Sequence, residues 1–264
     1  MSYLQAWILS LVQGLTEFLP VSSSGHLVIV PYLLDFSKPP LFFDILVHLG
    51  TLAAVIFFLR KDLLSICTGI FHQTKAHETW LLIGKIALAI LPAAAAGFLL
   101  KNQLEALFFN PGSVGWAYFG TAALLFLMML FYKGTKTMKQ LKWSDALLIG
   151  FFQSLAMVPG FSRSGFTLFG ALMVGMERVE ALRFSFLISI PAIIGAFVFE
   201  LHGYESFPLP WSISLLALVV SALSGLLAIF ILKHFLKKAS LHWFGFYCLL
   251  LGIVIVNLHF AGKI

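Results

Sequence analysis

Two stretches of this chain combine chemically capable side chains with glycine and proline. In the first, Gln13 and Glu17 are spaced i, i+4, so a helix would place both on one face. A polar turn follows directly, containing Ser22, Ser23, Ser24, Gly25 and His26. Carboxylate, hydroxyl and imidazole groups can transfer protons, attack electrophilic centres or hold oxygen-preferring cations. Residues 13–26 are therefore a candidate site.

The second stretch is basic. After a Pro-Gly pair at 159–160 it contains Ser162, Arg163, Ser164, Gly165 and Thr167. In both stretches a helix would begin among the serines, which places free N–H groups and the positive end of a dipole there. Two converging helix starts make an anion site, and phosphate is the usual occupant. The guanidinium fork of Arg163 suits phosphate oxygens.

Each of these residues also has a simpler structural interpretation. The serines could bond to their own helix backbone, His26 could make a structural hydrogen bond, and Glu17 could only pair with Arg163. We favour a working site, because all these groups fall on two breaks in otherwise apolar sequence. Asp44 and His48 form a further i, i+4 pair that could line the same cavity. For Lys85 we expect an ammonium group that reaches the membrane interface.

Composition places the chain in a membrane. Hydrophobic residues make up 60% of the 264 residues, charged residues only 11%, and mean hydropathy is +0.99. Soluble domains carry about 25% charged residues, so a soluble enzyme, a nucleic-acid binder and a disordered protein all fit poorly. The net charge of +6 is explained by lysines and arginines in cytoplasmic loops, and we expect no nucleic-acid partner.

Six apolar runs are long enough to cross a bilayer, which takes roughly 17–25 residues. They are Phe42–Leu59, Leu81–Leu100, Val114–Tyr132, Phe184–Glu200, Ser212–Leu232 and Trp243–Phe260. Residues 3–34 and 145–176 differ, because each reads as two short helices joined by one of the polar breaks. Their pieces are too short for a hydrocarbon core of roughly 30 Å.

The distribution of lysine and arginine predicts that both broken regions are re-entrant hairpins. If each returns to its own side, one side of the membrane receives twelve lysines and arginines and the other only Lys38, Lys101 and Lys263. If both regions span, the division is eight to seven. Only the first division obeys the positive-inside rule, and it places both termini away from the cytoplasm.

The expected fold is therefore an all-α integral membrane protein with six transmembrane helices and two re-entrant hairpins. It forms one membrane domain in two halves, residues 1–132 and 145–260, each with one hairpin and three spans. An odd number of spans per half inverts one half relative to the other. Inverted repeats place their site at the repeat interface, where the two hairpin tips should meet.

The two stretches carry a family resemblance. The sequence QGLTEFLPVSSSGH, residues 13–26, resembles the undecaprenyl-diphosphatase family, also called the bacitracin-resistance phosphatases. The sequence PGFSRSGFT, residues 159–167, is similar to its second signature, and the resemblance covers essentially the whole chain. It implies hydrolysis of undecaprenyl diphosphate to the monophosphate, which recycles a lipid carrier for cell-wall polymers and gives bacitracin tolerance. It also implies a bacterial cytoplasmic membrane and a divalent cation, Mg²⁺ or Ca²⁺.

One position departs from many members of that family. Gln13 stands where many relatives carry glutamate, and an amide cannot act as a general base. The carboxylate role, including any metal ligation, therefore falls on Glu17, with Gln13 in support.

The resemblance also suggests a mechanism. We favour Ser23 as the nucleophile and His26 as general acid or base, while a direct attack by water or by His26 stays open. Arg163 would hold the phosphates, together with the hydroxyls of Ser22, Ser24, Ser162, Ser164 and Thr167. The first hairpin opens outward, so we expect access from the periplasm or exterior. The expected partners are a polyprenyl diphosphate and membrane lipid, and a homodimer is compatible with the sequence.

Two alternatives belong to other classes. A polyprenyl-phosphate flippase or transporter would use the same inverted repeat without releasing phosphate, and one site could serve both roles. A purely structural membrane protein has no reason to place Glu17 and Arg163 on broken helices.

Overall fold

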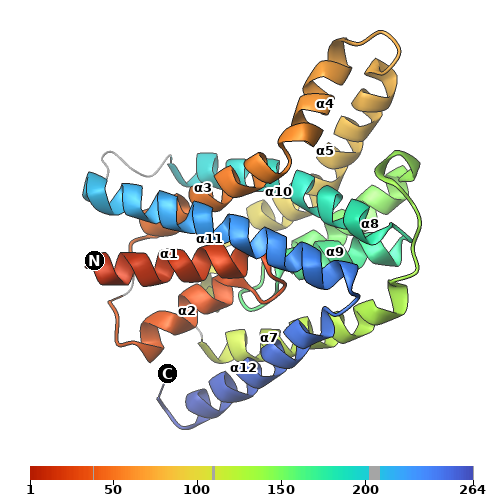
Figure 1. Ribbon diagram of the computed structural model, residues 1–264. Helices are drawn as coiled ribbons and strands as arrows, with labels where there is room; N and C mark the ends of the chain where they lie inside the picture. Colours follow the sequence, from red (N-terminus) through yellow and green to blue (C-terminus); the bar gives the residue numbers. More distant parts are fainter. Residues whose placement is uncertain (38, 109–110, 202–208, 264) are drawn as a thin grey trace.

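The computed structural model describes residues 1–37, 39–108, 111–201 and 209–263, and every regular element in these residues is helical (Figure 1). Residue Lys38 lies outside the described residues, as does the side chain of Lys101. The first half contains α1 (Tyr3–Phe18), α2 (Ser23–Leu33), α3 (Leu41–Phe58), α4 (Arg60–Phe71), α5 (Ala76–Leu99), α6 (Lys101–Phe108), α7 (Pro111–Leu127) and the 3₁₀ turn η1 (Met128–Phe131). The second half contains the 3₁₀ turn η2 (Met138–Gln140), α8 (Trp143–Leu155), α9 (Arg163–Met173), α10 (Arg178–Leu201), α11 (Trp211–Lys237) and α12 (His242–Phe260).

The prediction of an all-α integral membrane protein is confirmed. Within the described residues, six helical segments are long and apolar enough to cross a bilayer, namely α3, α5, α7 continued by η1, α10, α11 and α12. They coincide with the six predicted runs, although α10 begins earlier, at Arg178, and α11 ends later, at Lys237. The apolar runs stop at the first charged residues, whereas the helices continue past them, because charged side chains at span ends can reach water.

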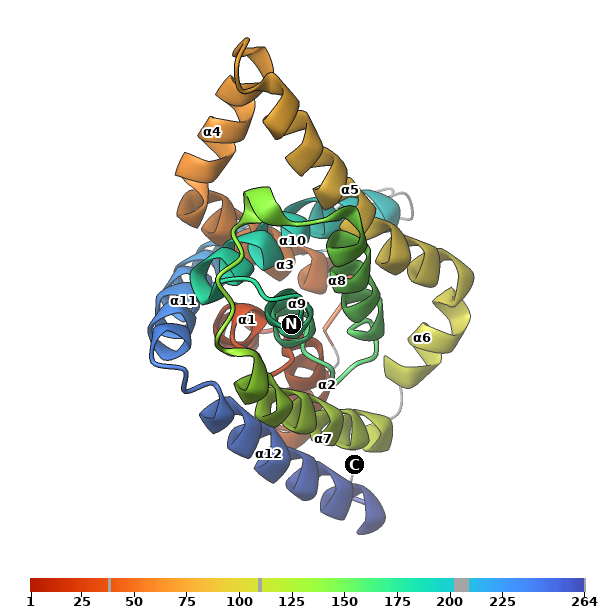
Figure 2. The same cartoon turned by 90° about the vertical axis from the view of Figure 1, so that its right-hand side faces the viewer.

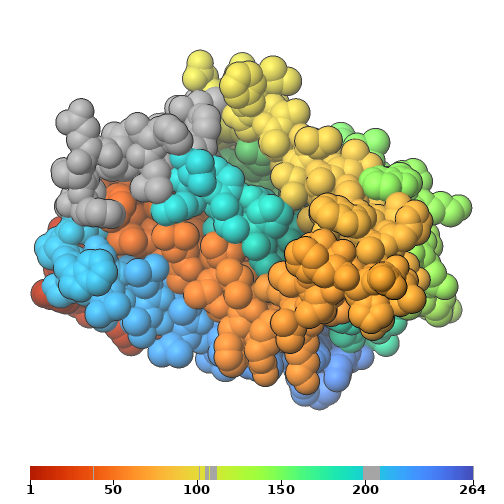
Figure 3. Space-filling model, turned by 90° about the horizontal axis from the view of Figure 1, so that it is seen from above, coloured from red at the N-terminus to blue at the C-terminus, as the bar shows by residue number. Residues whose placement is uncertain are grey.

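Two helices were not predicted, α4 and α6. Helix α4 is mostly exposed and forms a hairpin with the start of α5 that projects from the bundle (Figures 1 and 2). Seen from above, this hairpin stands beside α10, and α11 runs along the same face (Figure 3). Both helices lie outside the predicted spans, so the search for bilayer-length apolar runs passed over them.

The two broken regions fold as pairs of short helices, α1 with α2 and α8 with α9. Their lengths are 16, 11, 13 and 11 residues, or about 17–24 Å at the helical rise of about 1.5 Å per residue. The predicted division into two short helices is therefore correct for both regions. That the pairs re-enter the bilayer stays a prediction.

The long helices pack in a reciprocal pattern. Helix α1 packs on α11, as does α3, while α8 and α10 both pack on α5, and α7 packs on α12. Exchanging the two halves converts the α1–α11 contact into α8–α5 and the α3–α11 contact into α10–α5, and it converts α7–α12 into itself. An inverted repeat of residues 1–132 and 145–260 requires this pairing, and the repeat itself stays a prediction.

Close backbone approach fixes both helix pairs against their supports. A Cβ on Gly14 of α1 would lie 2.6 Å from the Ser221 carbonyl oxygen of α11, and a Cβ on Gly150 of α8 would lie 2.4 Å from the Ala89 carbonyl oxygen of α5. Small residues at such crossings are the usual means of packing helices in lipid. The expectation for Lys85 was wrong, because its side chain is buried on α5 instead of reaching an exposed interface.

Helix α9 occupies the middle of the molecule. Residues 164–172 are all buried, and helices α7, α8 and α10 pack around it (Figure 2). The sequence at its start is therefore held inside the bundle, where it faces the end of α1.

Candidate active site

The two helix breaks have the same capping hydrogen bonds. Ser22 caps α2 and Ser162 caps α9, and each hydroxyl accepts a hydrogen bond of 3.2 Å from the backbone N–H of the glycine three residues on. Each cap also contacts the serine two residues later, Ser22 with Ser24 at 3.3 Å and Ser162 with Ser164 at 3.1 Å. Both breaks therefore present a capped helix start with a pair of hydroxyls, as the sequence predicted.

The first break holds a strained residue. Ser22 has φ 65°, which is in the left-handed region that L-residues rarely adopt. Its carbonyl oxygen is held by His26 Nδ1 at 2.7 Å and by the Tyr118 hydroxyl at 3.3 Å. Gly25 allows this approach, because a Cβ there would lie 2.7 Å from the Tyr118 hydroxyl oxygen. Strained backbone of this kind persists where surrounding contacts determine it, and it clusters at functional sites.

Glu17 joins the two breaks. Its Oε1 accepts a hydrogen bond from Nη2 of Arg163, and the two side chains form an ion pair. Arg163 comes from the other half of the chain. Its Oε2 accepts from the Ser23 hydroxyl at 2.5 Å and from Gln13 Nε2 at 2.9 Å. The Glu17 side chain is 4% exposed and that of Arg163 is 28% exposed. The hairpin tips therefore meet through a buried carboxylate, as the sequence analysis expected.

His48 completes the surroundings of this carboxylate. Its Nε2 lies 3.7 Å from Glu17 Oε2, while its Nδ1 is 2.6 Å from the backbone carbonyl of Asp44. The predicted pair on α3 therefore contributes His48 to the site. Because a carbonyl oxygen only accepts, Nδ1 donates to it, and Nε2 is the ring nitrogen that faces the Glu17 carboxylate.

His26 lies in a different hydrogen-bond network from Ser23 and Glu17. Its Nδ1 contacts the Ser22 carbonyl and, at 2.9 Å, the Tyr118 hydroxyl, while its Nε2 is 2.7 Å from the Tyr247 hydroxyl. The Tyr247 ring is also stacked on the imidazole, with ring centroids 5.8 Å apart. Both ring nitrogens are therefore used in holding the turn, which is the structural interpretation that the sequence left open.

The remaining predicted hydroxyls divide between the site and the scaffold. The Ser164 hydroxyl donates to the Leu19 carbonyl at 3.2 Å, which ties the second break to the first. Thr167 donates to the Arg163 carbonyl at 2.8 Å and contacts the Ser185 hydroxyl of α10 at 2.5 Å. Thr167 thus bonds back to its own helix, yet it still lines the cavity beside Arg163.

The cavity at this junction is small. It measures about 10 Å³ and is lined by Glu17, Phe18, Arg163, Ser164, Thr167, Ser185, Phe186 and Ser189. That volume holds about one water molecule. A diphosphate group is far larger than this cavity.

Oxygen ligands for a hard cation are present at the same point. Gln13 Oε1 is buried and has no hydrogen-bond partner among the described residues, and the Gln13 amide lies against the Glu17 carboxylate. Within those residues no group of three or more His, Cys, Asp or Glu side chains could hold a metal. The donor set fits an ion that takes few protein ligands and shares the substrate's phosphate oxygens, which is how Mg²⁺ is usually bound.

Sequence reasoning missed the residues that support the site from other helices. Thr121 of α7 donates to the Gly160 carbonyl at 2.9 Å and accepts from the Ser162 N–H at 3.3 Å, so it fixes the second break. Tyr118 and Tyr247 hold His26, and Ser185 meets Thr167. These residues could have been recognised as polar side chains within apolar spans, because such side chains usually face the interior of the bundle.

Comparison with known proteins gives a consistent result. Residues 6–254 match the family described as bacitracin resistance protein BacA. The chain is 43% identical over 247 residues to the undecaprenyl-diphosphatase of Thermosipho africanus, covering 94% of this chain and 96% of the relative. It is 39% identical to the undecaprenyl-diphosphatase of Carboxydothermus hydrogenoformans, with 100% of each chain covered. It is 38% identical to undecaprenyl-diphosphatase 2 of Stutzerimonas stutzeri, covering 99% of this chain and 100% of the relative.

The match extends through both helix pairs and nearly all of the spans, and the relatives are similar in length to this chain. The resemblance identified from residues 13–26 and 159–167 is thereby confirmed, and the chain belongs to the bacitracin resistance protein BacA family.

Proposed function

We propose that this protein hydrolyses undecaprenyl diphosphate to undecaprenyl phosphate and inorganic phosphate in the bacterial cytoplasmic membrane. The observation that carries the proposal is the junction of Glu17, Ser23 and Arg163 between two capped helix starts. The names of the relatives support the same activity. The product is the lipid carrier for cell-wall polymers, and removal of the diphosphate accounts for bacitracin tolerance.

Arg163 and the two helix starts bind the diphosphate. The guanidinium leaves Glu17 for the phosphate oxygens, which opens the small cavity between the hairpin tips. The helix starts of α2 and α9 add N–H groups and the positive ends of two dipoles. These groups stabilise the negative charge on the transferred phosphoryl group, which is the main demand of this chemistry.

Ser23 attacks the terminal phosphorus. Its hydroxyl already donates to Glu17 Oε2, so the carboxylate receives the proton as the Ser23 Oγ–P bond forms. The bond between the terminal phosphorus and the bridging oxygen breaks, and undecaprenyl phosphate leaves with the proton that Glu17 had received. Water then attacks the phosphoserine, and the Glu17 carboxylate takes a proton from that water. Glu17 passes this proton to Ser23 Oγ as the Oγ–P bond breaks, so inorganic phosphate is released and Ser23 is restored.

Movement of Arg163 to the phosphate prepares Glu17 for this role. A carboxylate paired with a guanidinium is a weak base, and it gains basicity when the guanidinium turns to the substrate. Gln13 Oε1 and Glu17 would hold a Mg²⁺ or Ca²⁺ ion, and a bound ion supplies further neutralisation of phosphate charge. In place of a proton-transfer role, we assign His26 the positioning of the Ser22 turn, because both its ring nitrogens contact groups of the scaffold.

We further propose that the site opens to the periplasmic or exterior face. The distribution of lysine and arginine supports this side, since the first hairpin enters opposite the basic loops. The prenyl chain would lie in lipid or between helices, where it needs only apolar surface.

Phosphate release by detergent-purified protein tests the activity. Undecaprenyl and farnesyl diphosphate are supplied with Mg²⁺, with Ca²⁺ and with a chelator, and wild type is compared with Ser23→Ala and Ser24→Ala. Cation-dependent release whose kcat is lost in Ser23→Ala and kept in Ser24→Ala, which removes a phosphate-binding hydroxyl and should change KM alone, supports the proposed mechanism. Lipid translocation without phosphate release by folded protein would identify a transporter instead.

A further inference from the structure

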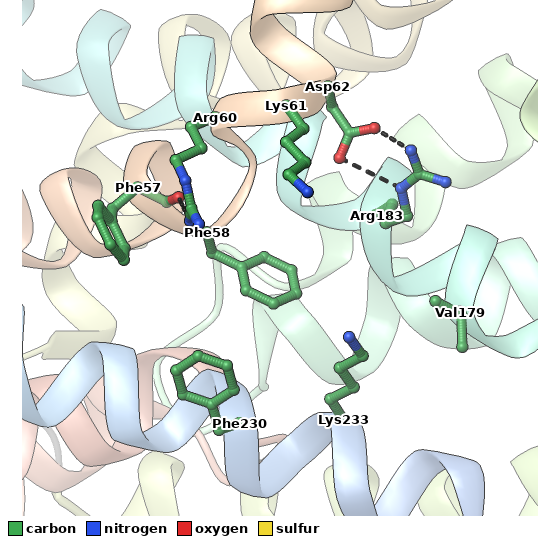
Figure 4. Close-up of a pocket in the computed structure, with 9 residues that line it drawn as sticks. All are labelled: Phe57, Phe58, Arg60, Lys61, Asp62, Val179, Arg183, Phe230 and Lys233. Atoms are coloured by element: carbon green, nitrogen blue, oxygen red, sulfur yellow. Dashed lines mark hydrogen bonds and ion pairs between the residues drawn. The ribbon is translucent and has the colours of Figure 1, made fainter.

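A second and larger cavity lies where the end of α3 and the start of α4 meet α10 and α11 (Figure 4). It measures about 320 Å³, within the range of small-ligand sites. The lining residues are Phe57, Phe58, Arg60, Lys61, Asp62, Val179, Arg183, Phe230 and Lys233. Four cations and one carboxylate give this lining a net charge of +3.

The carboxylates near this cavity are already engaged by one arginine. Arg183 donates to Asp62 through Nε at 3.2 Å and through Nη2, and it donates to Glu180 through Nη1 at 2.5 Å. Figure 4 shows that Asp62 points toward Arg183 and away from the open space. Asp62 therefore neutralises Arg183 and leaves the other cations of the cavity uncompensated.

Those other cations are Arg60, Lys61 and Lys233. Among the described residues, none of the three makes an ion pair with a carboxylate. Arg60 donates to the Phe57 carbonyl at 2.9 Å and lies over the Phe57 ring, 4.5 Å from its centroid. Lys61 and Lys233 point toward the same space from opposite sides (Figure 4). Two ammonium groups that face the same space attract an anion to it.

The remaining wall of the cavity is apolar and faces outward. Phe57 is 52% exposed and Phe230 is 53% exposed, although both belong to helices that can cross a bilayer. Phe58 packs edge-to-face on Phe230, with ring centroids 6.2 Å apart. A ligand here would therefore contact cations with its headgroup and aromatic rings with a hydrocarbon chain.

This cavity is separate from the proposed active site. Phe58 contacts Phe186 with centroids 5.9 Å apart, and Phe186 contacts Phe18 at 5.2 Å. Phe18 and Phe186 line the small cavity beside Glu17. The aromatic rings thus form a wall between the two cavities, and the larger one lies on the side that the lysine and arginine distribution assigns to the cytoplasm.

We propose that the larger cavity binds an anionic phospholipid of the cytoplasmic leaflet, with the lipid phosphate between Lys61 and Lys233 and an acyl chain along Phe57 and Phe230. Basic pockets between transmembrane helices on this side of a membrane are suited to acidic headgroups. The exposed phenylalanines favour a lipid over a soluble phosphate ester, because a soluble ligand would not use them. The proposal concerns binding alone and does not depend on the proposed hydrolysis.

Native mass spectrometry of the full chain, purified in detergent, tests this proposal. The probes are phosphatidylglycerol, phosphatidylcholine and inorganic phosphate, each titrated separately. The pocket variant is Lys61→Gln with Lys233→Gln, and the matched control is Lys237→Gln with Lys238→Gln, which removes the same charge from exposed positions near the end of α11. A third variant, Lys61→Arg with Lys233→Arg, keeps the charge of the pocket.

We expect wild type to bind phosphatidylglycerol in preference to phosphatidylcholine. The pocket variant should lose about 10- to 30-fold in affinity for phosphatidylglycerol, as expected for two lysines, whereas the control and arginine variants keep it. An equal loss in pocket and control variants would show general surface attraction and overturn the proposal. Tight binding of inorganic phosphate without lipid preference would replace the lipid site by a free-phosphate site. Thermal midpoints in lipid-free detergent establish that every variant is folded.

Discussion

The two helix breaks have the same capping contacts but different chemically capable side chains. Counted from the capping serines, Gln13 corresponds to Gln153, and Ser22, Ser24 and Gly25 correspond to Ser162, Ser164 and Gly165. The cap hydrogen bonds have the same length, and both helix pairs rest on a long helix of the other half through a glycine. The capping contacts and the close glycine support are therefore alike on both sides of the junction, although Ser22 has a positive φ and Ser162 does not.

Three of the positions that differ hold the proposed nucleophile, the proposed base and the histidine that supports the turn. Ser23 in the first break corresponds to Arg163 in the second, Glu17 corresponds to Met157, and His26 corresponds to Phe166. The first tip thus supplies the proposed nucleophile and base, and the second tip supplies the cation that binds phosphate. A pair of identical tips would bring like charges together, so a divided role is what allows the two tips to touch.

The largest effect should follow from breaking the contact between the tips. Arg163→Ala and Glu17→Gln should each lower kcat/KM roughly 10³-fold, because each removes a charged group that acts on the transferred phosphate. Arg163→Ala should also lower the free energy of unfolding by about 3–5 kcal/mol, since it leaves the buried Glu17 unpaired. Phosphate release and thermal unfolding measure the two effects.

The variant Arg163→Lys separates the effect on activity from the effect on stability. It keeps a positive charge beside Glu17 but loses the fork, so stability should stay near wild type while activity falls. Wild-type activity in Arg163→Ala would contradict the assignment of the second tip as the phosphate clamp.

Exchanging the serine that distinguishes the first tip should have the next largest effect. Ser23→Ala should lower kcat roughly 10²-fold or more with little change in KM, because the nucleophile is lost and phosphate binding is kept. Steady-state phosphate release measures both constants. Ser24→Ala, one residue away on the same helix, is the control for kcat, because it removes a phosphate-binding hydroxyl and should change KM alone. An equal loss of kcat in both variants would argue against nucleophilic attack by Ser23.

Glycine substitutions compare how α1 packs on α11 with how α8 packs on α5. Gly14→Ala and Gly150→Ala should each lower the free energy of unfolding by about 1–3 kcal/mol, because the new methyl group meets backbone of α11 or α5. Thermal unfolding in detergent measures the change. Gly195→Ala is the control, since a Cβ there meets nothing within 4 Å, and it should raise stability by up to about 1 kcal/mol.

The equivalence of the two caps predicts a smaller and equal effect. Ser22→Ala and Ser162→Ala should each cost about 1 kcal/mol, because each removes the same hydrogen bond to a glycine N–H. Hydrogen exchange at the first turns of α2 and α9 reports the two losses separately. Clearly unequal losses of stability would show that the two caps are not energetically equivalent, although their hydrogen bonds have the same length.

The smallest effect concerns the outer ends of the two helix pairs and appears only in acid. Helix α1 is capped by Ser2, which does not titrate, whereas Asp145 accepts hydrogen bonds at the start of α8 from the Lys142 N–H and from Lys136 Nζ. Partial burial raises the pKa of Asp145, but these hydrogen bonds outweigh it, so the pKa lies below its ordinary value.

Because the folded pKa is lowered, the stabilisation by Asp145 is complete above the unfolded value of about 3.9 and is lost as pH falls through the folded pKa. We expect a loss of about 1 kcal/mol or less, confined to α8. Hydrogen exchange at the start of α8, compared with α1 over the same pH range, measures it. Asp145→Asn should abolish the difference, and an acid-dependent change at α1 as well would point to another group.

The fold was predictable because the bilayer restricts what a chain can do. A hydrocarbon core of roughly 30 Å sets the length of each span, so apolar run length alone located all six. Helices α4 and α6 lie outside those runs, where no such length applies, and they were missed. The breaks were equally visible, since proline, glycine and charge inside apolar sequence conflict with a plain span.

The members of the site were predictable, but not all their partners. Glu17 and Arg163 stood out as charged residues on broken helices, and their contact followed from the meeting of the tips. The surroundings of His26 were not predictable, because Tyr118 and Tyr247 lie 92 and 221 residues away in the chain. Without the fold, His26 beside a serine and a carboxylate favoured proton transfer, whereas its contacts favour support of the turn.

The separation of 146 residues between Glu17 and Arg163 also affects how the protein is made. At ribosomal rates of about 5–20 residues per second, Glu17 is synthesised roughly 7 to 30 seconds before Arg163. During that interval the nascent chain has a carboxylate without its counter-charge, and it has no phosphate clamp. The chain therefore lacks the proposed phosphate clamp throughout translation of its first half, and we expect a chain that terminates before Arg163 to leave undecaprenyl diphosphate uncleaved.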